Sequence, residues 1–395
     1  MTLRKIPIVT TPLGFWKTAF HLANLFNNKQ AHSKLTHLIS SHIDRKHLFF
    51  LNSGLSCFFV ILEALKKISP KKEVILPAYT APSLVVAVKK ADLKPVLCDI
   101  SLDDFNSDFA LLPGLISQNT LCILGAHMFG IISGGLEDLK VKYSDIFIIE
   151  DCAQAMGSSI NNIPVGKLGD ISFFSFNKGK NIPTFGGGCI ATDSEELADI
   201  IKSVIGGMSL KQASFFVSCK IALKTLILSM AVKPWVYGMF YSLISRFKES
   251  TPPKDLNVGG YTILQAKLAL LLLRRIEELS RKRYDNGIRL IEELKDFEGL
   301  ILPKINKNTK PAFNRLPIVF SDLEKREKVE KNLCKAGIET SRMYLMPLHH
   351  HFDLNLSKEE LPNSTFFANH LLTLPTHPLL TLKTLKTIIN IIKTA

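Results

Sequence analysis

The apolar run Ile146-Phe147-Ile148-Ile149 leads directly into Glu150-Asp151-Cys152-Ala153-Gln154, and this junction decides the fold. A short, wholly apolar run is typical of a strand that is buried on both faces of a parallel sheet. Carboxylates at the end of such a strand lie at the edge where open α/β sheets bind their ligands. The junction therefore predicts an α/β fold with polar chemistry at the carboxyl edge of its sheet.

Apolar runs of the same kind precede and follow this junction. Helical stretches lie between them, such as the apolar spacing at 55–66 after a Ser-Gly turn. Strands that alternate with helices favour parallel pairing, with helices on both faces of the sheet. We therefore expect a mostly parallel wound sheet whose further strands lie at 73–76, 95–100, 120–124, 171–176 and 188–192.

Length and composition fit one large domain and a smaller one. The chain has 395 residues, of which 46% are hydrophobic and 21% charged, and this composition excludes wholesale disorder. The linker-like Ser250-Thr251-Pro252-Pro253 precedes a long helical stretch at 263–295. We expect a large domain over 1–255, with an apolar basic insertion at about 205–250, and a small C-terminal α/β domain over 256–395.

The seven cysteines form no CxxC pair and lie mostly in apolar runs. This spacing fits neither a zinc site nor a disulfide framework and predicts buried thiols in a reducing compartment. The consecutive side chains of His349-His350-His351 point in divergent directions, so we expect no metal site there either. The first residues contain no apolar stretch of a secretory signal, and we expect a cytoplasmic protein.

The net charge of +14 favours anionic partners. Residues 201–254 hold eight basic residues against the single acid Glu249, and so carry half of the excess. Aromatic residues such as Trp235 are interleaved with these lysines, which favours peripheral contact with an anionic membrane. Packing against the body or a partner subunit is an equal alternative. We expect no spanning helix, since lysines and Pro234 interrupt the segment, and no nucleic-acid partner.

Lys180 follows the aromatic run Phe173-Phe174-Ser175-Phe176 and has glycines on both sides. An amine in such a place can be partly desolvated, as a nucleophilic lysine requires. Asp151 ends a neighbouring predicted strand, where its carboxylate could pair with a pyridinium nitrogen. Lysine and aspartate together are the arrangement that pyridoxal phosphate requires, with a Schiff base at one end of the ring and a charge partner at the other.

A phosphate group needs a cradle of its own. Ser53-Gly54-Leu55-Ser56 stands at the start of the predicted helix at 55–66. The first amides of this helix, with the hydroxyls of Ser53 and Ser56, form an anion site. Ser175 could supply a further hydroxyl.

Taken together and in this order, these pieces resemble the DegT/DnrJ/StrS family of pyridoxal-phosphate-dependent sugar aminotransferases, which have fold type I. The resemblance covers most of the chain. Segments similar to the family's motifs are Ser53–Cys57, Glu73–Thr80, Lys94–Ile100, His127–Gly130, Glu150–Gly157, Gly169-Asp170 with Phe174–Phe176 and Lys180-Asn181, Leu264–Ala266, Pro347–His349 and Leu374–Pro378.

The resemblance implies roles for individual residues. Lys180 would form the Schiff base and carry protons, and Asp151 would keep the ring nitrogen protonated. Gln154 would hydrogen-bond near the ring, and Ser175 would bind the phosphate. Further residues implied in the site are Gly54 and the amides of Leu55 and Ser56 at the phosphate, Asn177 and Tyr79 at the cofactor, and His349 at the substrate mouth.

The sequence departs from the family pattern around the substrate. Asn177 replaces the family's histidine after F-S-F, and Ala81 replaces an aromatic residue that often stacks on the cofactor. The turn Phe185-Gly186-Gly187-Gly188 lacks the family's acid. Val258-Gly259-Gly260 replaces an N-Y-R stretch that reaches a neighbouring subunit's phosphate. These changes leave the core chemistry intact and put the usual substrate in doubt.

The resemblance implies a homodimeric aminotransferase. It would move an amino group from an amino acid, with glutamate as the expected donor, to a keto sugar that is linked to a nucleotide. Two alternatives stay open: a pyridoxal-phosphate enzyme acting on a non-sugar or lipid-linked carbonyl, and a membrane-docked scaffold without turnover. A dehydratase of the family is disfavoured, because those members lack a lysine at the position of Lys180.

Overall fold

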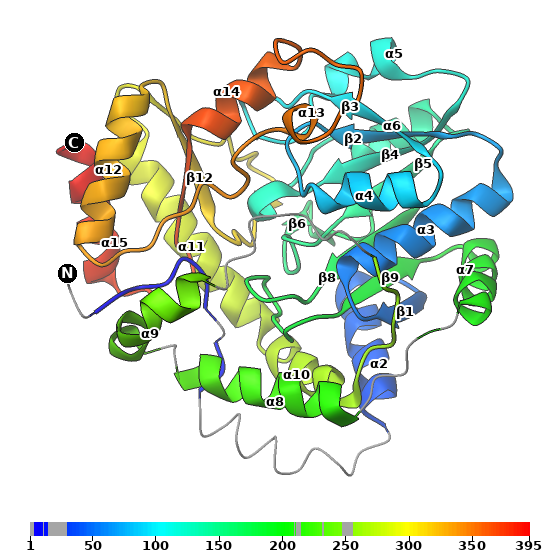
Figure 1. Cartoon of the computed structure of the whole chain (residues 1–395), viewed down its shortest axis with the longest axis horizontal. Coiled ribbons are helices and arrows are strands. Elements are labelled where there is room, and N and C mark those ends of the chain that lie inside the picture. The colour runs from blue at the N-terminus through cyan, green and yellow to red at the C-terminus, as the bar shows by residue number, and fades with distance from the viewer. Residues whose placement is uncertain are drawn as a thin grey trace.

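A seven-stranded sheet forms the centre of the protein (Figure 1). The computed structural model describes residues 4–10, 12–14, 30–208, 210, 215–230, 233–246 and 256–395. The strand order is β1-β9-β8-β5-β4-β2-β3; β9 runs antiparallel to both its neighbours, and the other pairs are parallel. The predicted wound α/β fold is confirmed. The strands are β1 (His47–Leu51), β2 (Glu73–Pro77), β3 (Lys94–Cys98), β4 (Thr120–Ala126), β5 (Phe147–Asp151), β8 (Ile171–Ser175) and β9 (Gly188–Thr192).

Helices cover both faces of this sheet. Strand β4 shows why the run is apolar throughout, because Ile123 faces one core whereas Cys122 and Leu124 face the other. The helices on the Cys122 face are α3 (Gly54–Ile68), α4 (Ser83–Lys90) and α7 (Glu195–Gly207). Those on the Ile123 face are α2 (Ala31–Ile43), α6 (Leu136–Lys142) and α10 (Ile263–Leu273).

The parallel strands present their carboxyl ends at one edge of the sheet. Asp151 is the last residue of β5, and Ser175 is the last residue of β8. Gly54 begins α3 three residues after β1 ends, with Ser53 as the N-cap. The topology therefore gathers the predicted site residues at the edge where α/β sheets bind their ligands.

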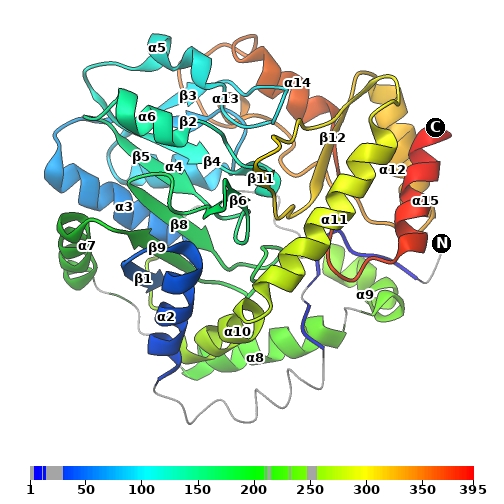
Figure 2. The same cartoon turned by 180° about the vertical axis from the view of Figure 1, so that it is seen from behind.

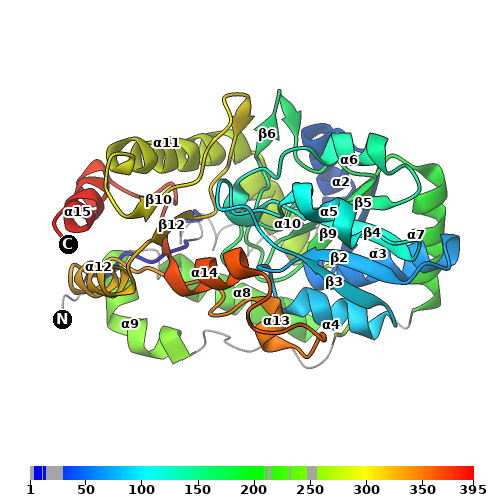
Figure 3. The same ribbon diagram turned by 90° about the horizontal axis from the view of Figure 1, so that it is seen from above.

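A smaller antiparallel sheet, β10-β12-β13, lies beside the large one (Figure 3). Residues of its strands share an apolar core with the helices that surround it. The elements of this part are β10 (Leu300–Ile301), β12 (Leu316–Phe320), β13 (Leu371–Leu374), α11 (Ile276–Leu294), α12 (Leu323–Lys335), α14 (Pro362–His370) and α15 (Leu382–Lys393). Short elements are α5 (Leu112–Leu115), α13 (Leu348–His351), the 3₁₀ turns Phe109–Leu111 and Met128–Gly130, and a small sheet of β6 (Ser159–Ile160), β7 (Ile163–Pro164) and β11 (Thr309–Lys310).

The predicted helical stretch at 263–295 is two helices rather than one. It breaks at Arg274 and Arg275, between α10 and α11. Figure 2 shows α10 beside α2 and α11 extending away along the smaller sheet. Because α10 packs on α2, the chain after residue 255 contributes to both parts, and the predicted domain boundary stays a prediction.

The basic insertion folds as two helices, α8 (Phe215–Met230) and α9 (Pro234–Arg246). α8 packs against α10. α9 is tied to the smaller part, because the Tyr237 hydroxyl donates to Glu339 Oε2 at 2.6 Å and the Lys5 amide donates to the Pro234 carbonyl at 2.9 Å. Among the residues described, no helix is long and apolar enough to cross a bilayer.

Candidate active site

Asp151 and Lys180 lie close together at the carboxyl edge of the sheet. Asp151 is buried, and its Oδ1 accepts a hydrogen bond from the Ala153 amide at 2.9 Å. Lys180 stands in the loop after β8, where its amide donates to the Asn177 carbonyl at 3.2 Å. Each charge acts on the pKa of the other group, so the two side chains lie within electrostatic reach of each other. The structure thus brings together the two residues that the sequence singled out.

Burial lowers the pKa of the Lys180 amine to about 8. The nearby Asp151 carboxylate opposes this shift, and the Arg315 guanidinium adds to it. Exposed lysines have a pKa near 10.4, so a far larger share of Lys180 is neutral at physiological pH. A neutral, desolvated amine is the nucleophilic form of lysine.

Burial has the opposite effect on Asp151, whose carboxyl pKa is raised. The hydrogen bond from Ala153 and the charges of Lys180 and His127 act against this shift. A buried carboxylate is stable only when a cation or hydrogen-bond donors face it. The site therefore favours a positively charged ligand group beside Asp151.

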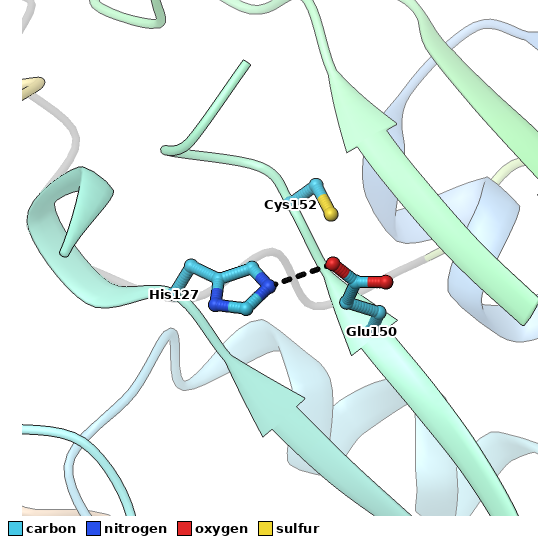
Figure 4. Close-up of side chains that lie close together, drawn as sticks. All are labelled: His127, Glu150 and Cys152. Atoms are coloured by element: carbon cyan, nitrogen blue, oxygen red, sulfur yellow. Dashed lines mark hydrogen bonds and ion pairs between the residues drawn. The ribbon is translucent and has the colours of Figure 1, made fainter. Parts of the chain in front are cut away.

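Glu150, which directly precedes Asp151 in the chain, forms a buried hydrogen-bonded pair with His127 (Figure 4). The Ser133 amide donates to His127 Nδ1 at 3.0 Å, so Nε2 carries the proton and donates it to Glu150 Oε1 at 2.9 Å. Glu150 also accepts from the amides of Gly166, Leu168 and Gly169. Burial acts to raise the pKa of Glu150, but these donors outweigh it and hold the pKa below its usual value.

With Cys152, these two residues form a cluster whose side-chain atoms lie within 4.8 Å of one another. Both nitrogens of His127 and both oxygens of Glu150 already have protein partners. Burial and the neighbouring carboxylates raise the pKa of the Cys152 thiol, whereas a metal ligand must be a thiolate. The cluster is best explained as a support that fixes the ends of β4 and β5, and with them Asp151.

Gln154 leaves one polar atom without a partner. The residue is buried; its Nε2 lies 3.5 Å from Met128 Sδ, and its Oε1 has no hydrogen bond. A buried amide oxygen without a donor costs about 1–3 kcal/mol. Gln154 follows Asp151 by three residues, and its unpartnered oxygen indicates that a ligand completes the site.

The start of α3 touches the end of β8. A Cβ placed on Gly54 would lie 2.8 Å from Ser175 Cβ and 3.2 Å from Ser175 Oγ, so only glycine lets the helix come this close. Ser53 caps α3 by accepting from the Ser56 amide at 3.0 Å. The helix N-terminus and the Ser175 hydroxyl therefore form one place suited to an anion.

The segment that departs from the family pattern covers this cradle within the same chain. The Asn52 amide donates to the Gly259 carbonyl at 2.8 Å, and Asn52 Nδ2 donates to the Asn257 carbonyl at 2.9 Å. Ser56 Oγ lies 3.4 Å from the same Asn257 carbonyl. Residues 257–259 thus contact Asn52 and Ser56 through backbone carbonyls rather than through side chains.

Three of the residues implied by the resemblance have other surroundings. Asn177 is exposed and accepts from the Lys178 amide. Tyr79 is fully buried; its hydroxyl lies 3.2 Å from the Arg342 carbonyl and 3.1 Å from both the carbonyl and the amide of Tyr344. His349 is buried rather than exposed, and neither of its ring nitrogens has a partner. Their cofactor and substrate contacts stay predictions.

Sequence reasoning missed the contribution of the C-terminal part to the site. Asn314 Nδ2 donates to the Gly179 carbonyl at 2.6 Å and to Asn181 Oδ1 at 3.2 Å, so it holds both neighbours of Lys180. Arg315 follows it and acts on the charge of Lys180. The available signal was the polar pair Asn314-Arg315 directly before the apolar run at 316–320.

The donor set fits pyridoxal phosphate. An amine of lowered pKa, a buried carboxylate, an unpartnered amide oxygen and a helix N-terminus beside a hydroxyl correspond to the parts of that molecule. By contrast, a cavity of about 350 Å³ at the opposite, amino ends of the strands holds charges that are already paired, such as Asp193 with Arg45 and Lys167.

Comparison with known proteins gives a family. The sequence profile of the DegT/DnrJ/EryC1/StrS aminotransferase family matches residues 22–225 and 260–393. The chain is 24% identical to the dTDP-3-amino-3,4,6-trideoxy-alpha-D-glucose transaminase of Streptomyces venezuelae, over 86% of this chain and 80% of that one. It is 28% identical to the dTDP-4-dehydro-2,6-dideoxy-D-glucose 3-dehydratase of Saccharopolyspora spinosa, over 69% and 58%.

The fold is shared with solved structures. Helicobacter pylori PseC, an aminotransferase involved in the biosynthesis of pseudoaminic acid, superposes with a TM-score of 0.79 at 19% identity, covering 99% of each chain. The described fold is therefore fold type I.

The depressed pKa of Lys180 can be measured directly. In cofactor-free protein, the rate of reductive methylation at Lys180 should reach half its maximum near pH 8, because its amine loses its proton there. Exposed Lys386 on α15 serves as the control. Mass spectrometry of peptides from a pH series gives both curves. Coincident curves for the two lysines would contradict the burial of Lys180.

Proposed function

The chain belongs to the DegT/DnrJ/EryC1/StrS aminotransferase family, and we propose that it transfers an amino group from an amino acid to a keto sugar. It is a pyridoxal-phosphate-dependent enzyme. Glutamate is the proposed donor, and a sugar linked to a nucleotide is the proposed acceptor. The observation that supports this most is the Lys180 amine, whose pKa is lowered to about 8 beside the buried Asp151.

The residues divide the chemistry between them. When bound, pyridoxal phosphate supplies a conjugated cationic ring that withdraws electrons from the carbon bearing the amino group. Asp151 would face the ring nitrogen with its carboxylate and so favour its protonated form. Lys180 would anchor the cofactor covalently, and its amine, once freed, would carry the proton between the two carbons of the transfer. Gln154, Ser175 and the start of α3 would orient the ring.

The same groups distinguish amino transfer from dehydration. A relative of this chain is named as a dehydratase. Amino transfer consists of two half-reactions, and each of them needs a covalent anchor and a proton carrier. Lys180 would supply both. This retained amine favours the aminotransferase over the dehydratase, and also over a scaffold without turnover. A non-sugar or lipid-linked carbonyl stays the alternative acceptor.

We keep a homodimer as part of the proposal. Leu345 and Met346 are large apolar side chains that stay exposed just after Tyr344, close to the site. Exposed apolar residues next to a binding site are typical of a surface that a second subunit covers. A cytoplasmic location is likewise proposed, on the basis of the reduced, mostly buried cysteines.

A membrane surface is the proposed partner of α8 and α9. Leu223 and Ile227 lie on the exposed side of α8 together with Lys220 and Lys224, while Ile221 faces the body. On α9, Trp235 and Met239 are 61% and 66% exposed, one helical turn apart. Residues 215–246 contain no acidic side chain. Apolar and aromatic side chains among lysines complement an anionic lipid surface, at about 1 kcal/mol for each lysine.

The proposed reaction can be tested on one half of its cycle. Adding glutamate to the cofactor-loaded protein should change its visible absorption and release one 2-oxoglutarate per site. Asp151→Asn should slow this half-reaction at least about 100-fold, because the ring nitrogen loses its charge partner. Asp145→Asn, at an exposed carboxylate before β5, is the matched control and should react normally. A normal rate in the Asp151 variant would show that another residue holds the nitrogen.

Membrane contact should depend on salt. The protein should sediment with vesicles rich in phosphatidylserine at low ionic strength and leave them in high salt, with the Trp235 emission shifting to shorter wavelength on binding. Replacing Lys220 and Lys224 by Gln should weaken binding, whereas the same change at Lys383 and Lys386 on α15 should not. If sedimentation does not depend on vesicle charge or salt, the exposed face of α8 and α9 would instead be assigned to contact with a partner subunit.

A further inference from the structure

Arg315 brings an unpaired guanidinium to the active site. Its Nε lies 3.4 Å from Asn314 Oδ1, and within the described ranges no Asp or Glu side chain reaches ion-pairing distance. We propose that Arg315 binds a carboxylate of the amino-acid donor, an inference that rests on the proposed function.

The position of Arg315 is fixed relative to Lys180. Arg315 stands between Asn314, which bonds to Gly179 and Asn181 on the two sides of Lys180, and β12, which begins at Leu316. The Asn314 amide also donates to the Phe129 carbonyl at 2.8 Å. The backbone that carries the guanidinium is therefore held to the same loop that carries the catalytic amine.

Two buried arginines of this protein have their partners within the chain. Arg45 pairs with Asp193 at 3.1 Å and donates to the carbonyls of Gly166 and Gly169. Arg283 donates to the carbonyls of Phe313 and Asn314. Arg315 is half-buried and differs from both, because among the described residues its side chain makes one hydrogen bond, the 3.4 Å contact of Nε with Asn314 Oδ1. Its two terminal nitrogens are therefore available to a ligand.

The surroundings of Arg315 leave a carboxylate as the fitting ligand. Burial lowers the pKa of Arg315, whereas Tyr344, Glu339 and Tyr79 oppose this shift. The charge of Arg315 lowers the pKa of Lys180, so the two cations lie near each other. The phosphate cradle lies elsewhere, at Gly54 and Ser175. A planar guanidinium binds a carboxylate through two parallel hydrogen bonds, which sets the orientation of an amino acid toward Lys180.

The experiment compares Arg315→Gln with Arg281→Gln, a control at an exposed position on α11. Succinate, a dicarboxylate that cannot donate an amino group, is titrated calorimetrically into the cofactor-loaded protein. Uridine diphosphate is titrated separately, because a phosphate of the acceptor is the other anion that could use Arg315. Arg315→Gln should weaken succinate binding about 10- to 100-fold, as expected for loss of a charge-assisted hydrogen bond, and leave uridine diphosphate binding unchanged.

Loss of uridine diphosphate binding alone would assign Arg315 to the acceptor and overturn the proposal. Unchanged succinate binding, or no succinate binding by the unaltered protein, would overturn it as well. Arg315→Lys should restore part of the succinate affinity, since it keeps the charge and loses the paired geometry. The methylation midpoint of Lys180 should rise above pH 8 in Arg315→Gln, because one nearby cation is lost, but stay below the value near 10.4 of an exposed lysine, which checks that Lys180 stays buried.

Failure of the proposed function would look different. If the unaltered protein binds succinate through Arg315 but releases no 2-oxoglutarate from glutamate, the carboxylate site stands and the donor or the reaction has to be revised. If glutamate reacts normally in Arg315→Gln, with an unchanged half-saturating concentration, the proposed function is supported and the proposed role of Arg315 in binding the donor carboxylate is wrong.

Discussion

The burial of a carboxylate and an amine next to each other is the constraint on which the rest of this structure depends. Asp151 and Lys180 are each unfavourable in an apolar place, and each makes the other tolerable. The parallel sheet supplies that place, because its strands end together at one edge between two helical layers. The chemistry follows from the same burial, since it lowers the pKa of the Lys180 amine and so raises the share of the neutral, nucleophilic form.

Two sets of contacts fix the backbone that carries Asp151 and Lys180. Behind Asp151, Glu150 takes donors from His127 and from the turn at 166–169, so the ends of β4 and β5 cannot shift independently. Beside Lys180, Asn314 reaches from the C-terminal part to the residues on both sides of the lysine. The loop that carries Lys180 is therefore fixed by both parts of the chain, and the proposed cofactor site lies where these parts meet.

Local patterns predicted much of this from the sequence. The apolar runs marked β2, β3, β4, β5, β8 and β9, because strands buried on both faces carry no polar alternation. The pairing of Asp151 with Lys180 followed from strand ends in a parallel sheet. Contacts across long separations could not be read in this way: the break between α10 and α11, the burial of His349 and the reach of Asn314 and Arg315 all depend on tertiary packing.

The central claim is that Lys180, among the lysines of this chain, is the one that binds pyridoxal phosphate covalently. Reduction of the loaded protein with borohydride, followed by peptide mass mapping, tests it most directly. The account predicts a single pyridoxyl adduct on Lys180, and none in Lys180→Ala treated in the same way. An adduct at another lysine, or an equal adduct in the variant, would contradict the site described here.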